Sequence, residues 1–142
     1  MFFENKILKY LLSFALMLSF LSGCYSTAKF DSKIMYQLNE LRTRSLVIVG
    51  LATEDYSKHE NSVNKLKDDL ISAYEYVKKS DLNEATVKQV DLLLSDKGHL
   101  LGGFLEKWQQ KGKLSQVFVN GMRQNISKTF DQIIILEGSK RK

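Results

Sequence analysis

Apolar side chains recur at steps of three or four residues through most of this chain, and this spacing constrains the fold more than any other feature. Steps of this size place side chains on one face of an α-helix, where they can be buried together. The sequence also contains no proline, so the residue that most strongly interrupts a helix is absent. The chain therefore favours long amphipathic helices. The first apolar face comprises Ile34, Leu38, Leu41, Ile48 and Ala52.

The first two predicted helices are joined by a short polar stretch. The first begins at Asp31 or Ser32 and ends near Ala52. The segment Ser57-Lys58-His59-Glu60 then matches a capping box, in which the serine and glutamate side chains bind free backbone N–H groups at a helix start. Because the spacing is almost unbroken between the two segments, one very long helix is the alternative, although such lengths are rare in globular domains. The second apolar face comprises Val63, Leu66, Leu70, Tyr74 and Val77.

The third predicted helix starts after a second candidate cap, with Asp81 as N-cap and Glu84 at the third position. We expect Asp96-Lys97-Gly98 to interrupt it. Gly112 is the expected C-cap, because glycine readily adopts the left-handed conformation that ends many helices. The apolar face comprises Val87, Val90 and Leu94 before the interruption, and Leu101, Phe104, Leu105 and Trp108 after it.

The fourth predicted helix extends from Leu114 to about Leu136 and is closed by Gly138. Four amphipathic helices with short connections favour an all-α fold, an up-and-down four-helix bundle in which sequential helices are antiparallel neighbours. The bundle domain is expected over residues 31–138, followed by a basic tail at 139–142. The apolar face of this helix comprises Leu114, Phe118, Met122, Ile126, Phe130 and Ile133.

The N-terminus has a different pattern, that of an export signal. Lys6 and Lys9 form a short basic region, and an apolar run follows over residues 10–21. This run has the length of a signal-peptide hydrophobic region and is too short to cross a bilayer as a helix. It ends in Leu21-Ser22-Gly23-Cys24, with a leucine three residues before the cysteine and small residues between them.

This arrangement resembles the signal peptide and lipobox of bacterial lipoproteins. The resemblance implies cleavage before Cys24, so that residues 1–23 are removed and 24–30 form a short lipidated tether. It also implies acylation of the Cys24 thiol, typically with three chains such as palmitate, and stable anchoring takes at least two. Tyr25 replaces the aspartate that commonly retains such proteins at the inner membrane, which implies the periplasmic face of the outer membrane. The alternative is an ordinary apolar helix with a buried cysteine.

The mature chain would contain 119 residues, enough for one domain. It would carry 19 basic and 15 acidic residues, a net charge of +4. Since nucleic acid is not expected outside the cytoplasm, this balance indicates an anionic membrane surface or an acidic partner. The tail Lys140-Arg141-Lys142 could rest on lipid headgroups; the alternative, which we favour, is a solvated, frayed terminus.

Side chains that could carry chemistry are few. Cys24 is the only cysteine, and no serine lies in a Gly-x-Ser-x-Gly elbow. His59 and His99 are the only histidines. Asp55 and His59, with Glu60 adjacent, could share a helix face, but metal sites usually need three or more convergent ligands. We therefore expect a non-enzymatic protein with no cofactor and no metal.

Gly102-Gly103 is the most unusual local feature, because each glycine in a helix costs about 1 kcal/mol relative to alanine. Such a pair can allow close packing or a kink, which we favour, or it can open a cleft. If the neighbouring aromatic side chains were exposed, they would mark an interaction surface. The candidate partner or ligand surface comprises Leu101, Gly102, Gly103, Phe104 and Trp108.

These observations favour a membrane-anchored helical lipoprotein that binds another envelope protein, as small helical lipoproteins that pilot secretion-system subunits do. This comparison is an analogy of architecture alone. Three alternatives remain: a bundle that binds an apolar small molecule or lipid between its helices, an inhibitor or immunity-type lipoprotein, and an enzyme or metalloprotein built on His59.

Overall fold

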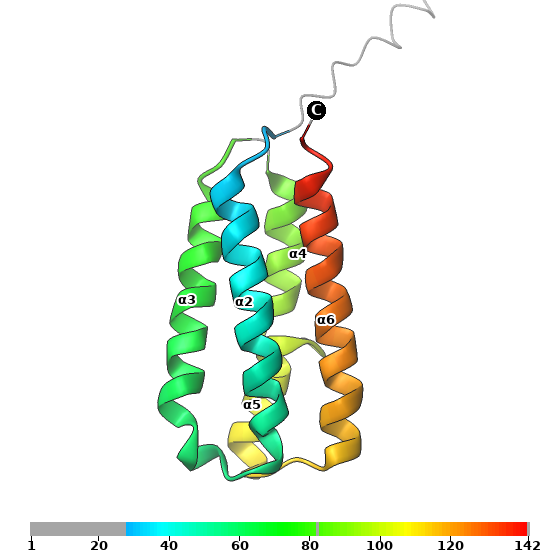
Figure 1. Cartoon of the computed structure of the whole chain (residues 1–142). Helices are drawn as coiled ribbons and strands as arrows, with labels where there is room; N and C mark the ends of the chain where they lie inside the picture. The colour runs from blue at the N-terminus through cyan, green and yellow to red at the C-terminus, as the bar shows by residue number, and fades with distance from the viewer. Residues whose placement is uncertain (1–27, 82, 142) are drawn as a thin grey trace, which may run out of the picture.

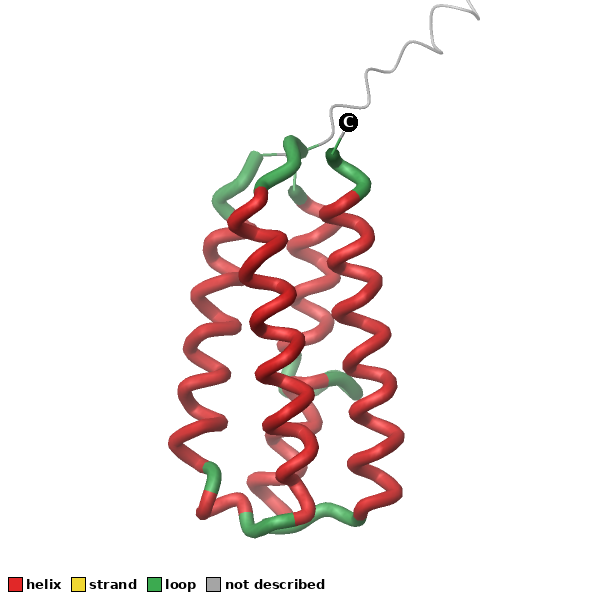
Figure 2. Tube along the Cα trace, in the orientation of Figure 1, coloured by secondary structure: helices red, strands yellow, loops and turns green. Residues whose placement is uncertain are grey.

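The computed structural model describes residues 28–81 and 83–141 of the chain, and this part is all-helical, with no β-strand (Figure 2). The predicted all-α class is therefore confirmed, with five α-helices in the described part rather than four. They are α2 (Ser32–Gly50), α3 (Glu60–Lys78), α4 (Glu84–Leu94), α5 (Leu101–Lys111) and α6 (Gln116–Gly138), and the short 3-10 helices η1 (Leu51–Thr53) and η2 (Tyr56–Lys58) join α2 to α3.

The long helices α2, α3 and α6 lie side by side with α4, and α5 follows α4 towards the lower end of the molecule (Figure 1). The first described residues, the connection from α3 to α4 and the C-terminus meet at one end. We call this the tether end and define it as the described residues 28–34, 75–81, 83–88 and 136–141. The connections from α2 to α3 and from α5 to α6 lie at the opposite end.

One continuous apolar core joins all five helices. Its members on α2 and α3 are largely those that the three–four spacing predicts. On α4 the predicted Val90 is buried, but Thr86 and Leu93 take the places of the predicted Val87 and Leu94, which are only partly buried. Of the residues predicted for the last helix, Phe118, Met122 and Leu114, which precedes α6, are only partly buried; the fully enclosed residues of α6 are Val119, Ile126, Phe130, Ile133 and Glu137.

Two cross-helix polar contacts fix how α2 packs against its neighbours. The Arg42 guanidinium donates to Asp131 at 2.8 Å and to Ser127 at 2.9 Å, which joins α2 to α6. Arg44 pairs with Asp69 of α3 at 2.6 Å. Both pairs lie at partly exposed positions, so they contribute little free energy compared with the apolar core. The pairs instead set how α2 is aligned along its neighbours, because each joins one turn of α2 to one turn of an adjacent helix.

Helix α2 is capped by Asp31, one of its two predicted first residues, whereas the caps predicted for α3 and α4 are wrong. The Asp31 carboxylate accepts from the backbone N–H of Lys33 at 2.7 Å and that of Ile34 at 3.4 Å, as an N-cap should. Ser57 instead lies within η2, and α3 begins after His59. Asp81 lies two residues before the N-cap of α4, which is Asn83. At α3, the turn η2 contains Ser57, so the helix begins after the predicted cap.

The predicted interruption of the third helix is confirmed. Helix α4 ends at Leu94 and α5 begins at Leu101. Gly112 is the C-cap of α5, as predicted, with a positive φ of 73° that glycine adopts readily, but its ψ of −47° differs from that of the left-handed helical conformation. Ser115 then caps α6 by accepting from the Phe118 N–H, so α6 begins two residues after Leu114.

The N-terminal predictions lie outside the described residues. They concern the signal peptide 1–23, the box Leu21-Ser22-Gly23 and the cysteine Cys24. Within residues 28–81 and 83–141, no helix has both the length and the apolar character needed to cross a bilayer.

Candidate functional site

The predicted surface around Gly102-Gly103 is buried. Leu101 and Trp108 are fully enclosed and Phe104 is 1% exposed, so the exposed aromatic side chains that would mark an interaction surface here are not present. The reason is that α5 directs its apolar face into the common core. The large apolar side chains of this segment stabilise the fold and are not presented to a partner.

The two glycines allow the first turn of α5 to pack directly on the end of α4. A Cβ atom added to Gly102 would lie 2.0 Å from the carbonyl oxygen of Leu94. One added to Gly103 would lie 1.8 Å from the carbonyl oxygen of Gly98. Because both obstacles are backbone atoms, no side-chain rotation could relieve them. Close packing, the favoured interpretation of the pair, is therefore what the geometry supports.

Trp108 holds the opposite end of the molecule together. Its indole N–H donates to the carbonyl oxygens of Glu54 at 3.0 Å and Gly112 at 3.1 Å. The ring of Tyr56 meets it edge-on with centroids 5.4 Å apart. Burial raises the pKa of Tyr56, and the charges of Glu60 and Glu106 add to this rise.

The candidate metal ligands do not converge. His59 lies beside Trp108, and its Nε2 atom is 3.0 Å from a carboxylate oxygen of Glu54. Asp55 pairs with Lys113 at 3.1 Å. His99 lies in the connection between α4 and α5. Among the described residues, no three His, Cys, Asp or Glu side chains are grouped so that they could hold a metal ion.

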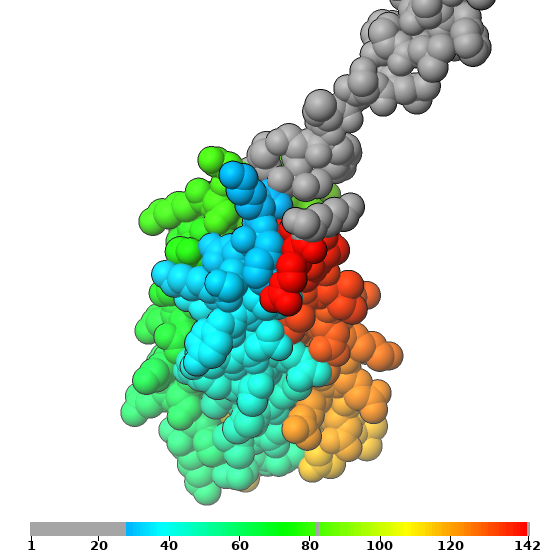
Figure 3. Space-filling view, turned by 45° about the horizontal axis from the view of Figure 1, so that its top comes forward, coloured from blue at the N-terminus to red at the C-terminus, as the bar shows by residue number. Residues whose placement is uncertain are grey.

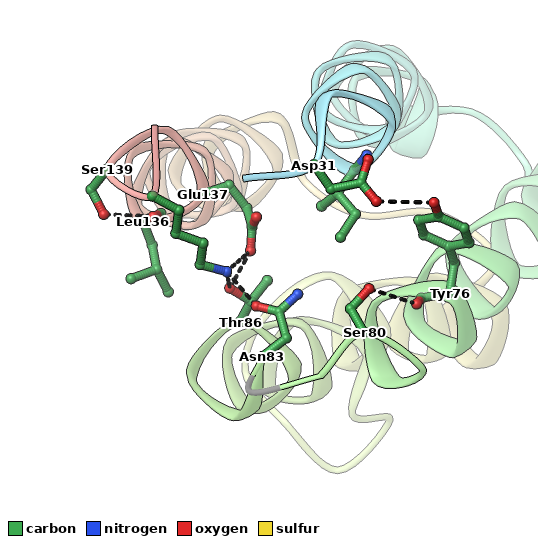
Figure 4. A network of polar contacts seen from close by, with 10 residues as sticks. Asp31, Tyr76, Ser80, Asn83, Thr86, Leu136, Glu137 and Ser139 are labelled. Atoms are coloured by element: carbon green, nitrogen blue, oxygen red, sulfur yellow. Dashed lines mark hydrogen bonds and ion pairs between the residues drawn. The ribbon is translucent and has the colours of Figure 1, made fainter. Parts of the chain in front are cut away.

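A buried polar cluster at the tether end is the most distinctive site in the described chain (Figure 4). Glu137, at the end of α6, is completely buried. The Lys140 ammonium donates to Glu137, to Asn83 and, at 3.0 Å, to the Thr86 hydroxyl. Thr86 in turn donates to Glu137. The cluster thus joins the C-terminus of the chain to the start of α4.

The charges within this cluster compensate each other. A buried carboxylate is costly unless it is paired and hydrogen-bonded, and Lys140 supplies the opposite charge with only 9% of its side chain exposed. Three acceptors engage the lysine ammonium, which has three N–H donors. The second carboxylate oxygen of Glu137 has no hydrogen-bond partner among the described residues. The arrangement therefore acts as a polar clasp between α4 and α6.

Sequence reasoning placed Lys140 in a solvated basic tail, and that expectation is wrong for this residue. The sequence did contain one indication of this contact. Glu137 lies four residues after Ile133, so the helical spacing places its carboxylate on the buried face of the helix. A carboxylate there needs a cation, and Lys140 lies one turn further on. The partners on α4, Thr86 and Asn83, follow from tertiary packing and have no sequence signature.

A second polar contact at this end holds the start of α2. The Tyr76 hydroxyl of α3 donates to the Asp31 carboxylate at 2.9 Å. Partial burial alone would raise the pKa of Asp31, but the Lys33 N–H, the Tyr76 hydroxyl and the Ile34 N–H together lower it below its usual value. The same hydrogen bond, with some burial, raises the pKa of Tyr76.

The first and last described residues also contact one another. The Arg141 guanidinium lies over the Phe30 ring, 4.3 Å from its centroid, and Lys33 lies 4.2 Å from the centroid of Tyr76. Ala28, the first described residue, is only 6% exposed. The chain is therefore already packed against the helices at Ala28, and both ends of the described part lie at the tether end.

In the described part of the chain, the internal cavity is small, and the larger hollows are grooves open to solvent. The internal one, between α2, α3, α4 and α6, is about 10 Å³ and is lined by apolar side chains and Gln37. That is room for one water molecule at most. An open groove of about 530 Å³ runs along α6 beside α2 and is lined by Leu46, Asn120, Arg123, Gln124, Ser127 and Lys128.

Comparisons with known proteins give no relative for this chain. No family model, no curated protein and no solved structure matches it.

Proposed function

We propose that this protein is a lipid-anchored, non-enzymatic accessory of the bacterial cell envelope that binds another envelope protein and holds it at the membrane. The lipobox-like segment Leu21-Ser22-Gly23-Cys24 supports cleavage before Cys24 and acylation of its thiol. With Tyr25 next to the cysteine, the proposed location is the periplasmic face of the outer membrane.

The observation that carries this proposal is how soon the fold begins after the cysteine. Ala28 is already buried, and only four residue steps separate it from Cys24. Four extended residues span at most about 14 Å. An acylated Cys24 would therefore hold the domain directly at the membrane surface, as a protein that retains a partner there requires.

We further propose that α4 and α5 together take the place of one interrupted helix, which makes the domain an up-and-down four-helix bundle. Their junction at Gly102 and Gly103 is packed backbone to backbone, and α5 follows α4 along the same side of the molecule (Figure 1). The long sides of the bundle then remain available to a partner, and an open groove of about 530 Å³ lies beside α6 on the side that it shares with α2.

The alternative of a bundle that encloses an apolar ligand gains no support, because the internal cavity of about 10 Å³ is far smaller than such a ligand. No described feature favours the inhibitor or immunity-type alternative over the accessory protein.

Affinity capture from the native envelope tests the proposal. The wild-type protein and Cys24→Ala would be compared, with acylation of Cys24 checked by mass spectrometry of the purified protein. We expect an acylated wild-type protein that enriches a specific envelope protein, and loss of that enrichment when the anchor is removed. An unmodified Cys24 would overturn the lipoprotein assignment, and an acylated protein that enriches nothing would overturn the accessory role.

A further inference from the structure

Positive charge is concentrated at the tether end. Its 26 residues contain seven basic and five acidic side chains, a net charge of +2. The opposite end, taken as residues 48–63 and 108–119, has 28 residues, and its three basic and three acidic side chains cancel. Half of the net charge of +4 in the mature chain therefore lies at the end where the described part of the chain begins.

The excess cations at this end are exposed and come from separate parts of the chain. Lys140 is not one of them, because its charge is compensated by Glu137. Among the described residues this is the only ion pair at the tether end, so the other cations are held by no carboxylate there. The exposed ones are Lys29, Lys33, Lys78, Lys79, Lys88 and Arg141.

These residues cover a broad end of the molecule rather than a pocket. In Figure 3, which turns the tether end forward, the first described residues, the α3–α4 connection and the C-terminal residues meet around it. The groove between α3 and α4 at this end is lined by Lys78, Lys79 and Lys88, but also by the carboxylates of Asp81, Glu84 and Asp91. Its mixed charge does not suit a compact anion, whereas dispersed cations suit an extended anionic surface.

We infer that the tether end is a second membrane contact, in which these cations bind the anionic headgroups of phospholipids beside the acylated Cys24. The inference rests on the proposed lipid anchor, which brings this end within about 14 Å of the cysteine. The Debye length is about 10 Å at 0.1 M salt, so the nearest cations lie within range of the headgroup charges. The anchor then fixes position, and the cations fix orientation, with the bundle standing away from the membrane.

Vesicle binding by the unacylated mature chain tests this inference separately from the anchor. Residues 24–142 with Cys24→Ser contain the entire apolar core. Sedimentation with vesicles of phosphatidylglycerol and phosphatidylcholine would be compared with pure phosphatidylcholine. The test variant carries Lys29→Gln, Lys78→Gln and Lys79→Gln. The control carries Lys58→Gln, Lys97→Gln and Lys111→Gln, which remove the same charge from exposed positions elsewhere.

We expect binding to the anionic vesicles only, with loss at high salt. The test variant should bind roughly 100-fold more weakly, because each basic residue near an anionic surface contributes about 1 kcal/mol and about 1.4 kcal/mol is a factor of ten. The control should bind as the parent does, within about threefold.

Three results would overturn the inference: no binding to anionic vesicles, equal binding to neutral ones, or equal weakening in both variants. Equal weakening of both variants would mean that the total charge of the protein determines binding, whatever the position of the charges. A tether end that binds an acidic protein instead of lipid would give no binding to anionic vesicles. Acylation of Cys24 does not enter this assay, so a failure here and a failure of the proposed anchor are distinguishable.

Discussion

At the scale of single residues, glycines in this protein have opposite roles according to their surroundings. Gly103 lies where α5 meets the end of α4, and a Cβ there would overlap the Gly98 carbonyl oxygen. Gly121 lies on the exposed side of α6, and a Cβ there would meet nothing within 4 Å. The sequence shows both as glycines in helical patterns, so only the packing tells them apart.

We predict that Gly103→Ala lowers the free energy of unfolding by about 2–3 kcal/mol or more, because the overlap is with backbone and requires α5 to move. Gly121→Ala should raise it by about 0.5–1 kcal/mol, because alanine has the higher helix propensity. Urea unfolding of both variants beside the wild type measures the two effects. Equal effects of the two substitutions would contradict the close packing described for α5.

Asp31 combines a helix cap with a tertiary hydrogen bond to Tyr76, and its charge should make stability depend on pH. Its pKa is lowered in the folded protein, so its contribution is complete above the unfolded pKa near 3.8 and is lost as pH falls through the folded value. Asp31→Ala should cost about 1 kcal/mol at neutral pH.

The matched variant is Asp31→Asn, which retains a cap oxygen but cannot titrate. The free energy of unfolding of both proteins would be measured from neutral pH down to about pH 2. We expect the wild type to be more stable than Asp31→Asn at neutral pH, and this difference in stability to decrease as the pH falls. An advantage that stays constant over this range would exclude the charge of Asp31 as its source.

At the scale of secondary-structure elements, apolar spacing predicted the helices better than local capping motifs predicted where they begin. The spacing depends on a whole buried face, which tertiary packing enforces at every turn. A capping motif depends on one turn, and the added turn η2 displaced Ser57 from the start of α3. The interruption between α4 and α5 was predictable because Gly98 and its polar neighbours break the pattern locally.

The candidate site was much less predictable. The clasp of Glu137 and Lys140 with Thr86 joins α6 to α4 across more than fifty positions in the sequence. No periodicity relates the two segments. The segment around Gly102, by contrast, was a candidate surface only on the condition that its aromatic side chains were exposed. The apolar face of α5 already indicated burial, and burial is what the structure has.

We predict that Lys140→Met destabilises the protein by about 3–5 kcal/mol, because it leaves the buried Glu137 carboxylate without its cation. The double variant Glu137→Leu with Lys140→Met should recover most of this loss, since apolar residues of similar volume replace the pair. Lys128→Met, at an exposed position of the same helix, should change stability by less than about 0.5 kcal/mol. Thermal and urea unfolding measure all three, and a double variant as unstable as Lys140→Met would argue against compensation by the pair.

At the scale of the whole molecule, the two ends of the bundle differ in chemistry but share one core. The tether end is polar and basic, and the opposite end is closed by Trp108 with Tyr56. Between them, the buried side chains of all five helices form one continuous cluster. Such a core gives a single cooperative unit in small domains. A disturbance at one end should therefore be felt at the other.

Trp108 is the only tryptophan and reports on the end remote from the polar clasp. Its fluorescence and the helical circular dichroism should follow one coincident urea transition in the wild type. Lys140→Met, which acts at the tether end, should shift both signals to the same lower midpoint, because the loss of the clasp lowers the stability of the entire unit. If the circular dichroism moved while the fluorescence of Trp108 kept the wild-type midpoint, the tether end would unfold independently. The end that contains Trp108 would then stay folded while the tether end opens first, and the molecule would not unfold as a single cooperative unit.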